Sequence, residues 1–240
     1  MRFPDTRAAT AATLLRTAAV LAAAACLAWL GCARAAEPVV VLPAPAVDDP
    51  KHSGPLETAV LAGGCFWGMQ AVFEHVRGVH GVLAGYTGGR FETAHYADVG
   101  TGTTGHAESV QITFDPGAVS YGELLQIYLS VAHDPTELNR QGPDSGTQYR
   151  SDIFYSDDTQ RRIAASYIAQ LEQLHSFGRP IVTRIDALKR FYPAEGYHQD
   201  FYLKNPSYPY IVVIDLPKIR ELEQLFPQDY LATPVTVAAR

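Results

Sequence analysis

The chain contains the stretch Thr58-Ala59-Val60-Leu61-Ala62-Gly63-Gly64-Cys65-Phe66-Trp67-Gly68, in which an apolar run ends at two glycines and a cysteine. The apolar run predicts a strand over 57–62, and the apolar residues at 69, 72, 73 and 76 predict a helix over 65–77. Cys65 is therefore expected at a strand-to-helix turn. Unpaired backbone N–H groups and the positive end of the helix dipole favour a thiolate at such a position.

Two alternatives remain for Cys65 from this stretch alone, namely a reactive nucleophile or a buried structural cysteine. The two glycines before it allow a tight turn and a close approach of a ligand to the backbone. Phe66 and Trp67 place aromatic surface beside the sulfur.

Residues 1–35 have the features of a secretory signal peptide: a basic start, an apolar segment over 17–31, and the small-x-small sequence Ala33-Arg34-Ala35. We therefore expect an exported, periplasmic protein that is cleaved after Ala35. Lipoprotein processing at Cys32 is the alternative, because Leu30-Gly31-Cys32 partly resembles a lipobox. The apolar segment is short for a membrane span, and we expect no stable span after cleavage.

Cleavage would remove Cys26 and Cys32 and leave Cys65 as the only thiol, which excludes a disulfide within the mature chain. The net charge is −6 for the whole chain, and loss of four arginines and one aspartate would bring it to about −9. This charge argues against nucleic acid and anionic membranes as partners.

The remaining chain divides into a proline-rich linker over 36–55, one folded domain over 56–226, and a tail over 227–240. Within the domain we predict further strands over 82–86, 106–114, 149–155 and 181–185, and helices over 120–132, 156–177 and 217–225. Long loops over 88–105 and 134–148 separate them. Residues 191–210 are aromatic and irregular, and 211–214 form either a last strand or an apolar cover segment.

The first six predicted elements follow the order βαββαβ, which is typical of ferredoxin-like folds. We therefore predict an α/β (α+β) two-layer sandwich with a ferredoxin-like core, extra C-terminal elements, and long loops at one end.

Glu108 is the second candidate for chemistry, because it shares a face of its strand with Val110, Ile112 and Phe114. A carboxyl group on an apolar face loses hydration, which raises its pKa and lets it act as a general acid near neutral pH. The alternative is a glutamate at a strand end that faces solvent or pairs with an arginine.

Tyr96, Asp144 and Tyr149 lie in or beside the two long loops, where each could bind a substrate or simply form turns. The eight histidines show neither an HExxH pattern nor a CxxC companion, so we expect no metal site. Nucleotide-binding fingerprints are also absent from the sequence.

Gly64-Cys65-Phe66-Trp67-Gly68 resembles the signature of the peptide methionine sulfoxide reductase A family. Further stretches resemble family motifs in family order: Gly85-Tyr86-Thr87-Gly88-Gly89, Thr104-Gly105-His106-Ala107-Glu108, Gly146-Thr147-Gln148-Tyr149-Arg150-Ser151, His198-Gln199-Asp200 and Lys204-Asn205-Pro206. The resemblance covers about residues 57–210.

The resemblance implies that Cys65 attacks the sulfoxide sulfur and becomes a sulfenic acid, while Glu108 protonates the sulfoxide oxygen. It also implies a set of substrate-binding residues, with Tyr96 and Tyr149 at the oxygen, Phe66 and Trp67 around the methyl group, and Asp144 on the polar side. We expect His198 to contact residues that line the site without touching the substrate itself.

Many relatives carry recycling cysteines near the C-terminus, but residues 205–240 contain none. An internal disulfide relay is therefore excluded in the mature chain. We expect an external thiol, either a small molecule or a thioredoxin-like protein, to reduce the sulfenic acid. We expect no bound cofactor and a monomeric protein.

The resemblance favours an exported enzyme that reduces the S epimer of methionine sulfoxide, free or in proteins. One alternative is a cysteine hydrolase or acyltransferase, which requires a histidine such as His106 or His198 beside Cys65. The other is an exported binding domain without enzymatic activity, in which Cys65 is buried and the segment 191–210 holds a ligand.

Overall fold

The computed structural model of the chain describes residues 41–237. The predicted signal peptide with its cleavage site, Cys32, and the first residues of the linker lie outside the described residues. Within 41–237, none of the helices has the length and apolar character needed to cross a membrane.

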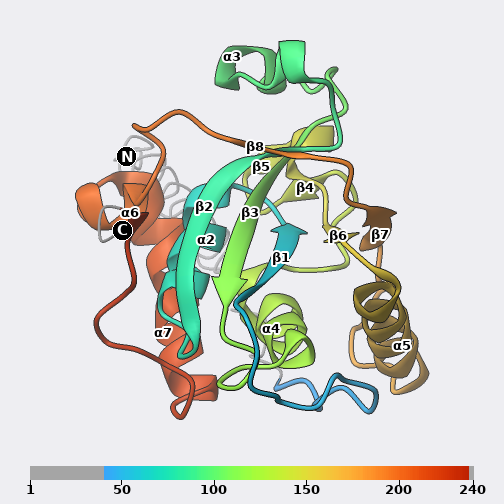
Figure 1. Cartoon of the computed structure of the whole chain (residues 1–240). Coiled ribbons are helices and arrows are strands. Elements are labelled where there is room, and N and C mark those ends of the chain that lie inside the picture. Colours follow the sequence, from blue (N-terminus) through green and yellow to red (C-terminus); the bar gives the residue numbers. More distant parts are fainter. Residues whose placement is uncertain (1–40, 238–240) are drawn as a thin grey trace, which may run out of the picture. The chain divides into compact units, whose positions relative to one another are not determined.

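A curled six-stranded sheet forms the centre of the domain, with the strand order β7-β6-β1-β3-β2-β8 (Figure 1). Neighbouring strands are antiparallel except for the parallel pair of β6 and β7. The strands are β1 (Glu57–Ala62), β2 (Val79–Thr87), β3 (Ala107–Phe114), β6 (Asp152–Tyr155), β7 (Arg184–Ala187) and β8 (Phe191–Pro193).

Four longer helices pack around the sheet (Figure 1). They are α2 (Phe66–Glu74), α4 (Tyr121–Ile127), α5 (Asp158–Gln173) and α7 (Leu216–Leu225). The capping box predicted for α4 is confirmed, because the Ser120 hydroxyl accepts from the Glu123 N–H and the Glu123 carboxylate accepts from the Ser120 N–H. Asp157 caps α5 by accepting from the Gln160 N–H, without the reciprocal bond of a capping box.

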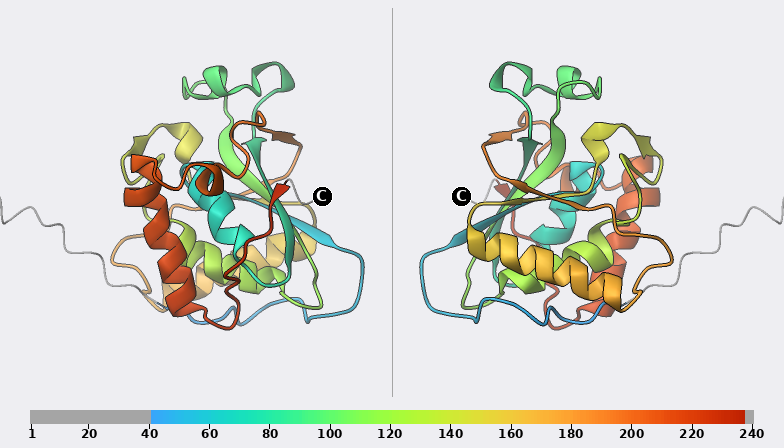
Figure 2. Two further views of the ribbon diagram at one scale, coloured as in Figure 1. Left: turned by 90° about the vertical axis from the view of Figure 1, so that its left-hand side faces the viewer. Right: turned by 90° about the vertical axis from the view of Figure 1, so that its right-hand side faces the viewer.

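The two long loops contain short elements that the sequence pattern did not indicate. The first loop forms η1 (Phe91–Thr93) and α3 (Tyr96–Val99), and it projects beyond the ends of β2 and β3 (Figure 2). The second loop forms a small hairpin, β4 (Arg140–Gln141) with β5 (Asp144–Ser145), followed by η3 (Thr147–Tyr149). The aromatic segment after β8 adds α6 (Phe201–Lys204).

Of the two alternatives for 211–214, a last strand is wrong, because these residues begin the helical turn η4 (Ile211–Asp215) that leads into α7. Ile211 and Asp215 are buried while Val212 and Val213 are exposed. This spacing of four places the two buried residues on one side of a helix, whereas a strand would bury alternate residues.

Two further strand predictions need correction at their starts. The strand predicted over 149–155 begins at Asp152, because Tyr149 lies in the preceding turn η3. The strand predicted over 181–185 begins at Arg184, where pairing with β6 starts. In both cases the onset depends on the neighbouring strand, which the local sequence does not contain.

The segments on either side of the predicted domain pack against it. Residues 41–55 have no helix or strand, but Leu42 is buried in the core and the Tyr167 hydroxyl donates to the Pro43 carbonyl at 2.8 Å. In the tail, the Leu231 N–H donates to the His75 carbonyl at 2.8 Å. The described parts of the linker and tail are therefore part of the folded structure.

Candidate active site

Cys65 lies between β1 and α2 as the N-cap residue of the helix, at the predicted strand-to-helix turn. The preceding Gly64 has φ +90, and a β-carbon there would lie 2.6 Å from Cγ of Gln141. Glycine is therefore required both by the backbone conformation and by the close approach of the second loop. Cys65 is the only cysteine within residues 41–237. It forms no disulfide there, and the residue is partly exposed.

Glu108 is buried beside the first turn of α2, with only 3% of its surface exposed. Its Oε2 accepts a hydrogen bond from the Phe66 N–H at 3.0 Å. Burial raises the pKa of Glu108 to about 8, Asp144 adds to the increase, and the Phe66 N–H opposes it. Glu108 is thus mostly protonated at neutral pH, and its predicted place on the apolar face of β3 is confirmed.

The protonation state of Cys65 differs from the expectation for a helix start. Burial raises the pKa of the thiol well above its ordinary value, and the carboxyl groups of Glu108 and Asp215 raise it further. The N–H of Trp67 lowers the pKa by a smaller amount. Desolvation and nearby negative charge therefore outweigh the backbone amides, and the resting residue is a thiol.

The two loops bring Tyr96 and Tyr149 to the same place. Burial raises the pKa of both hydroxyls, and interaction with the ionised forms of Glu108, Cys65 and Asp144 raises each of them further. Because such effects decline with distance, the five groups lie near one another. Sequence positions 65, 96, 108, 144 and 149, which lie on separate elements, thus meet in the fold.

Aromatic rings form the other wall of the site. Phe66 is buried, and its ring centre lies 5.0 Å from that of His198. Trp67 stacks on Phe201 with ring centres 3.7 Å apart, and its indole N–H donates to Nδ1 of His198 at 3.1 Å. His198 therefore contacts both aromatic residues and holds the orientation of the indole.

Tyr210 belongs to the site but was not among the predicted residues. Its hydroxyl donates to Oδ2 of Asp144, and its ring stands edge-on to Trp67 with ring centres 6.0 Å apart. Tyr210 thus connects the polar and aromatic walls. The only signal in the sequence was its membership of the aromatic segment 191–210.

Asp215 is a second site residue that sequence reasoning missed. It is fully buried against α2, since a β-carbon added at Gly68 would lie 2.2 Å from its Oδ1. Among the described residues neither carboxylate oxygen has a hydrogen-bond partner, and Nζ of Lys218 lies 3.9 Å away. Burial raises the pKa of Asp215 to about 6, so it is mostly charged at neutral pH.

The histidines proposed for a hydrolase have their hydrogen bonds elsewhere. Nδ1 of His106 accepts from the Gly89 N–H at 3.2 Å, and Nε2 donates to the Arg90 carbonyl at 2.9 Å. Nδ1 of His198 accepts from Trp67, while its Nε2 has no hydrogen-bond partner among the described residues. Within 41–237, no hydrogen bond joins either histidine to the Cys65 sulfur, which is the contact that this alternative requires.

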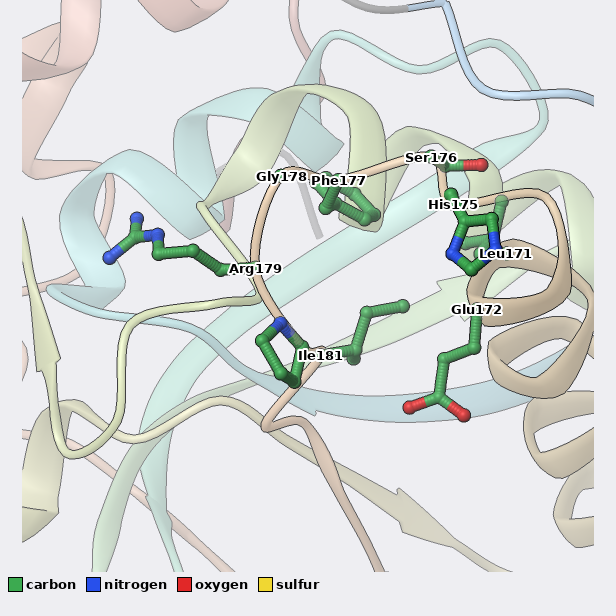
Figure 3. A pocket seen from close by; sticks show the side chains of 9 residues that line it. Leu171, Glu172, His175, Ser176, Phe177, Gly178, Arg179 and Ile181 are labelled. Carbon is green, nitrogen blue, oxygen red and sulfur yellow. The ribbon is translucent and has the colours of Figure 1, made fainter.

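A cavity of about 350 Å³ lies at the C-terminal end of α5 (Figure 3). It is lined by Leu171, Glu172, His175, Ser176, Phe177, Gly178, Arg179, Pro180 and Ile181, none of which belongs to the cluster around Cys65. Within 41–237, no group of three or more His, Cys, Asp or Glu residues is arranged to hold a metal ion.

The family model described as peptide methionine sulfoxide reductase matches residues 57–230. The chain belongs to this family. MsrA 2 of Mesorhizobium japonicum is 61% identical over 189 residues, covering 79% of this chain and 97% of the relative. MsrA 2 of Synechocystis is 55% identical over 170 residues, covering 71% of this chain and 79% of the relative.

Two solved structures resemble the fold. The reduced form of Mxr1 from Saccharomyces cerevisiae has a TM-score of 0.59 and 32% identity, covering 65% of this chain and 91% of that chain. Methionine sulfoxide reductase A of Corynebacterium diphtheriae has a TM-score of 0.55 and 34% identity, covering 73% and 89%. The chain is thus an oxidoreductase that reduces methionine sulfoxide.

Proposed function

We propose that this enzyme reduces the S epimer of methionine sulfoxide, free or in proteins, with Cys65 as nucleophile and Glu108 as general acid. The main support is the neutral Glu108 carboxyl group, which the Phe66 N–H holds at the first turn after Cys65. A protonated acid at that position can donate to an oxygen on a substrate whose sulfur lies against the thiol.

In the proposed step the Cys65 sulfur forms a bond to the sulfoxide sulfur while Glu108 gives its proton to the sulfoxide oxygen. The thiol proton passes to the Glu108 carboxylate. The protonated oxygen then moves from the substrate sulfur to the Cys65 sulfur, so that the substrate S–O bond and the bond between the two sulfurs both break. The net reaction converts a thiol and a sulfoxide to a sulfenic acid and a thioether. Protonating the oxygen makes the substrate sulfur more electrophilic, so a neutral thiol in the resting enzyme suits this order of events.

The remaining residues of the site are proposed to bind the substrate. The hydroxyls of Tyr96 and Tyr149 donate to the sulfoxide oxygen, and their raised pKa values keep them protonated as donors. Phe66 and Trp67 enclose the methyl group, which the buried aromatic wall supports. Asp144 orders the polar side.

We propose that an external thiol completes the cycle. Cys65 is the only cysteine among the described residues, and residues 205–240 contain no cysteine that could form a disulfide with it. One thiol attacks the sulfenic acid and releases water, and a second thiol then breaks the mixed disulfide to restore Cys65. A small thiol or a thioredoxin-like protein would serve, and no bound cofactor takes part.

Three further assignments belong to this proposal. The sequence features of residues 1–35 support export to the periplasm, with lipoprotein processing at Cys32 as the alternative. The strand order β6-β1-β3-β2 with antiparallel neighbours supports a ferredoxin-like core within a catalytic domain over 56–226. We propose that the protein is a monomer.

The catalytic assignment is tested by incubating the full chain with each epimer of N-acetyl-methionine sulfoxide and dithiothreitol. We expect reduction of the S epimer only, its complete loss in Cys65→Ser, and a loss of about 100-fold or more in Glu108→Gln. A dimedone adduct on Cys65 should form when the thiol is omitted. Reduction that survives in Cys65→Ser would refute the assignment.

The pH dependence gives a second measure of the same assignment. Glu108 has a raised pKa of about 8, so its proton is present below this pH and is lost as the pH rises through it. We expect kcat/KM to fall above about pH 8 for the wild-type enzyme. That decline should be missing in Glu108→Gln, and a decline that persists there would belong to another group.

A further inference from the structure

Four apolar side chains remain exposed around the aromatic wall of the site. They are Tyr197 (61% exposed), Tyr208 (48%), Val212 (45%) and Val213 (68%), and together they are called the apolar rim. The ring centre of Tyr197 lies 4.2 Å from that of His198, and Tyr208 stands edge-on to Trp67 at 6.1 Å. Tyr208 therefore lies against a residue of the proposed methyl pocket, and Tyr197 lies against the histidine that supports that pocket.

The rim is continuous along the chain from Tyr208 into the helical turn η4. The Val212 N–H donates to the Tyr208 carbonyl at 3.0 Å, so the two valines follow Tyr208 by one helical turn. The inner side of the same turn is held in place by buried Ile211 and Asp215. A rigid backbone thus presents apolar side chains outward, and an exposed apolar cluster beside a site is typical of a binding surface.

We propose that the apolar rim binds the polypeptide on either side of an oxidised methionine, with a preference for apolar neighbours. This proposal rests on the proposed pocket, because a methionine sulfoxide whose methyl group enters it leaves its own backbone at the mouth. The adjoining residues must then pass over whatever surface surrounds the mouth. At the rim, that surface consists of rings and branched aliphatic groups.

The chemistry of the substrate favours this occupant. Methionine is usually packed among apolar residues, and its oxidation to the polar sulfoxide disrupts that packing. The segment presented to the enzyme therefore carries exposed apolar neighbours. Tyrosine rings provide a large contact area at a small cost in side-chain entropy and tolerate varied partners, which suits an enzyme that meets many sequences.

The test compares three substrates under dithiothreitol: N-acetyl-methionine sulfoxide amide, a pentapeptide with leucine and phenylalanine flanking the sulfoxide, and one with serine and glycine. For the wild type we expect kcat/KM to be about ten-fold higher for the apolar peptide than for the polar one. In Tyr197→Ser and Val213→Ser we expect the ratio of kcat/KM between the apolar and polar peptides to fall about five-fold, because KM for the apolar peptide rises. We expect kcat/KM for the amide to stay within about two-fold of the wild-type value.

Leu174→Ser is the matched control, because Leu174 is 58% exposed at the end of α5, which lies at the β7 side of the sheet (Figure 1). We expect Leu174→Ser to leave kcat/KM unchanged for all three substrates. If the wild type does not reduce N-acetyl-methionine sulfoxide amide, the proposed function itself is contradicted, in addition to the proposed role of the apolar rim. An equal loss on all substrates in the rim variants would overturn the proposal.

Two other occupants give different results and would also overturn it. If the rim binds a protein reductant, the variants should slow turnover with thioredoxin while dithiothreitol rates stay unchanged on every substrate. If it binds a second copy of the chain, sedimentation should show a dimer that the variants dissociate, again without a change in peptide preference.

Discussion

At the scale of single residues, the protonation state of Cys65 is decided by burial and by neighbouring carboxyl groups, and not by its place at a helix start. Glu108 and Asp215 approach the sulfur from β3 and from the end of η4, and both raise the pKa of the thiol. Only one of these carboxyl groups has a place in the proposed chemistry. Asp215 has no such place, but its negative charge raises the pKa of the Cys65 thiol and so favours the protonated sulfur in the resting enzyme.

Replacing Asp215 with asparagine should make the Cys65 thiol more acidic. The carboxylate of Asp215 is mostly charged above its raised pKa of about 6, and a neutral amide would no longer oppose the thiolate. We expect the thiolate absorbance of Asp215→Asn to appear at lower pH, and alkylation by iodoacetamide at pH 7.5 to accelerate several-fold. Asp158→Asn, at an exposed helix start, is the control. Identical titration curves for the two variants would show that Asp215 has no such influence.

At the scale of elements, the turn between β1 and α2 joins the fold to the site. Gly64 bends the chain with a positive φ, and Gln141 of β4 fills the space where a side chain would stand. The Phe66 N–H then ties the first turn of α2 to Glu108 on β3. A small displacement of this turn would therefore move the nucleophile relative to its acid.

Gly64→Ala should lower both stability and turnover, and Gly142→Ala provides the matched comparison. Both glycines have positive φ, but an added β-carbon meets Gln141 at 2.6 Å in the first case and nothing within 4 Å in the second. We expect Gly142→Ala to cost about 1 kcal/mol of unfolding free energy with little effect on kcat. Gly64→Ala should cost more than this, at about 2–4 kcal/mol, and reduce kcat at least ten-fold. Equal effects of the two variants in urea unfolding and kinetics would contradict a role for the close contact.

At the scale of the whole molecule, the described parts of the linker and of the tail pack on the domain proposed over 56–226. Leu42 belongs to the central core, and the chain after α7 returns to pack along α2. A proline-rich composition indicates an extended chain but does not reveal whether that chain is free or is packed on a surface. Here it is packed, so the start of the described chain contributes to stability.

Leu42→Ala should destabilise the domain although it lies outside the predicted domain boundary. Leu42 is 1% exposed, whereas Leu56, nearer to β1, is 50% exposed. We expect a loss of about 2–4 kcal/mol for Leu42→Ala and less than about 0.5 kcal/mol for Leu56→Ala in urea unfolding. A loss for Leu42→Ala no greater than that for Leu56→Ala would mean that the segment does not contribute to the folded core.

The sequence by itself determined the features that depend on short-range pattern. The apolar run before Cys65 and the helical spacing after it predicted the strand, the turn and the helix. The alternation around Glu108 placed the acid on the apolar face of its strand but left a solvent-facing glutamate as an alternative, and the structure shows it buried. The capping box likewise located the start of α4. These succeed because backbone periodicity and local hydrogen bonds involve residues only a few positions apart.

The tertiary structure alone decided what depends on residues far apart in the chain. It placed Tyr210 on Asp144, brought Asp215 against α2, and made 211–215 helical where a strand was considered. It also reversed the expected state of Cys65 from thiolate to thiol. Desolvation and the Coulomb interaction depend on distance in space, and no spacing along the chain encodes them.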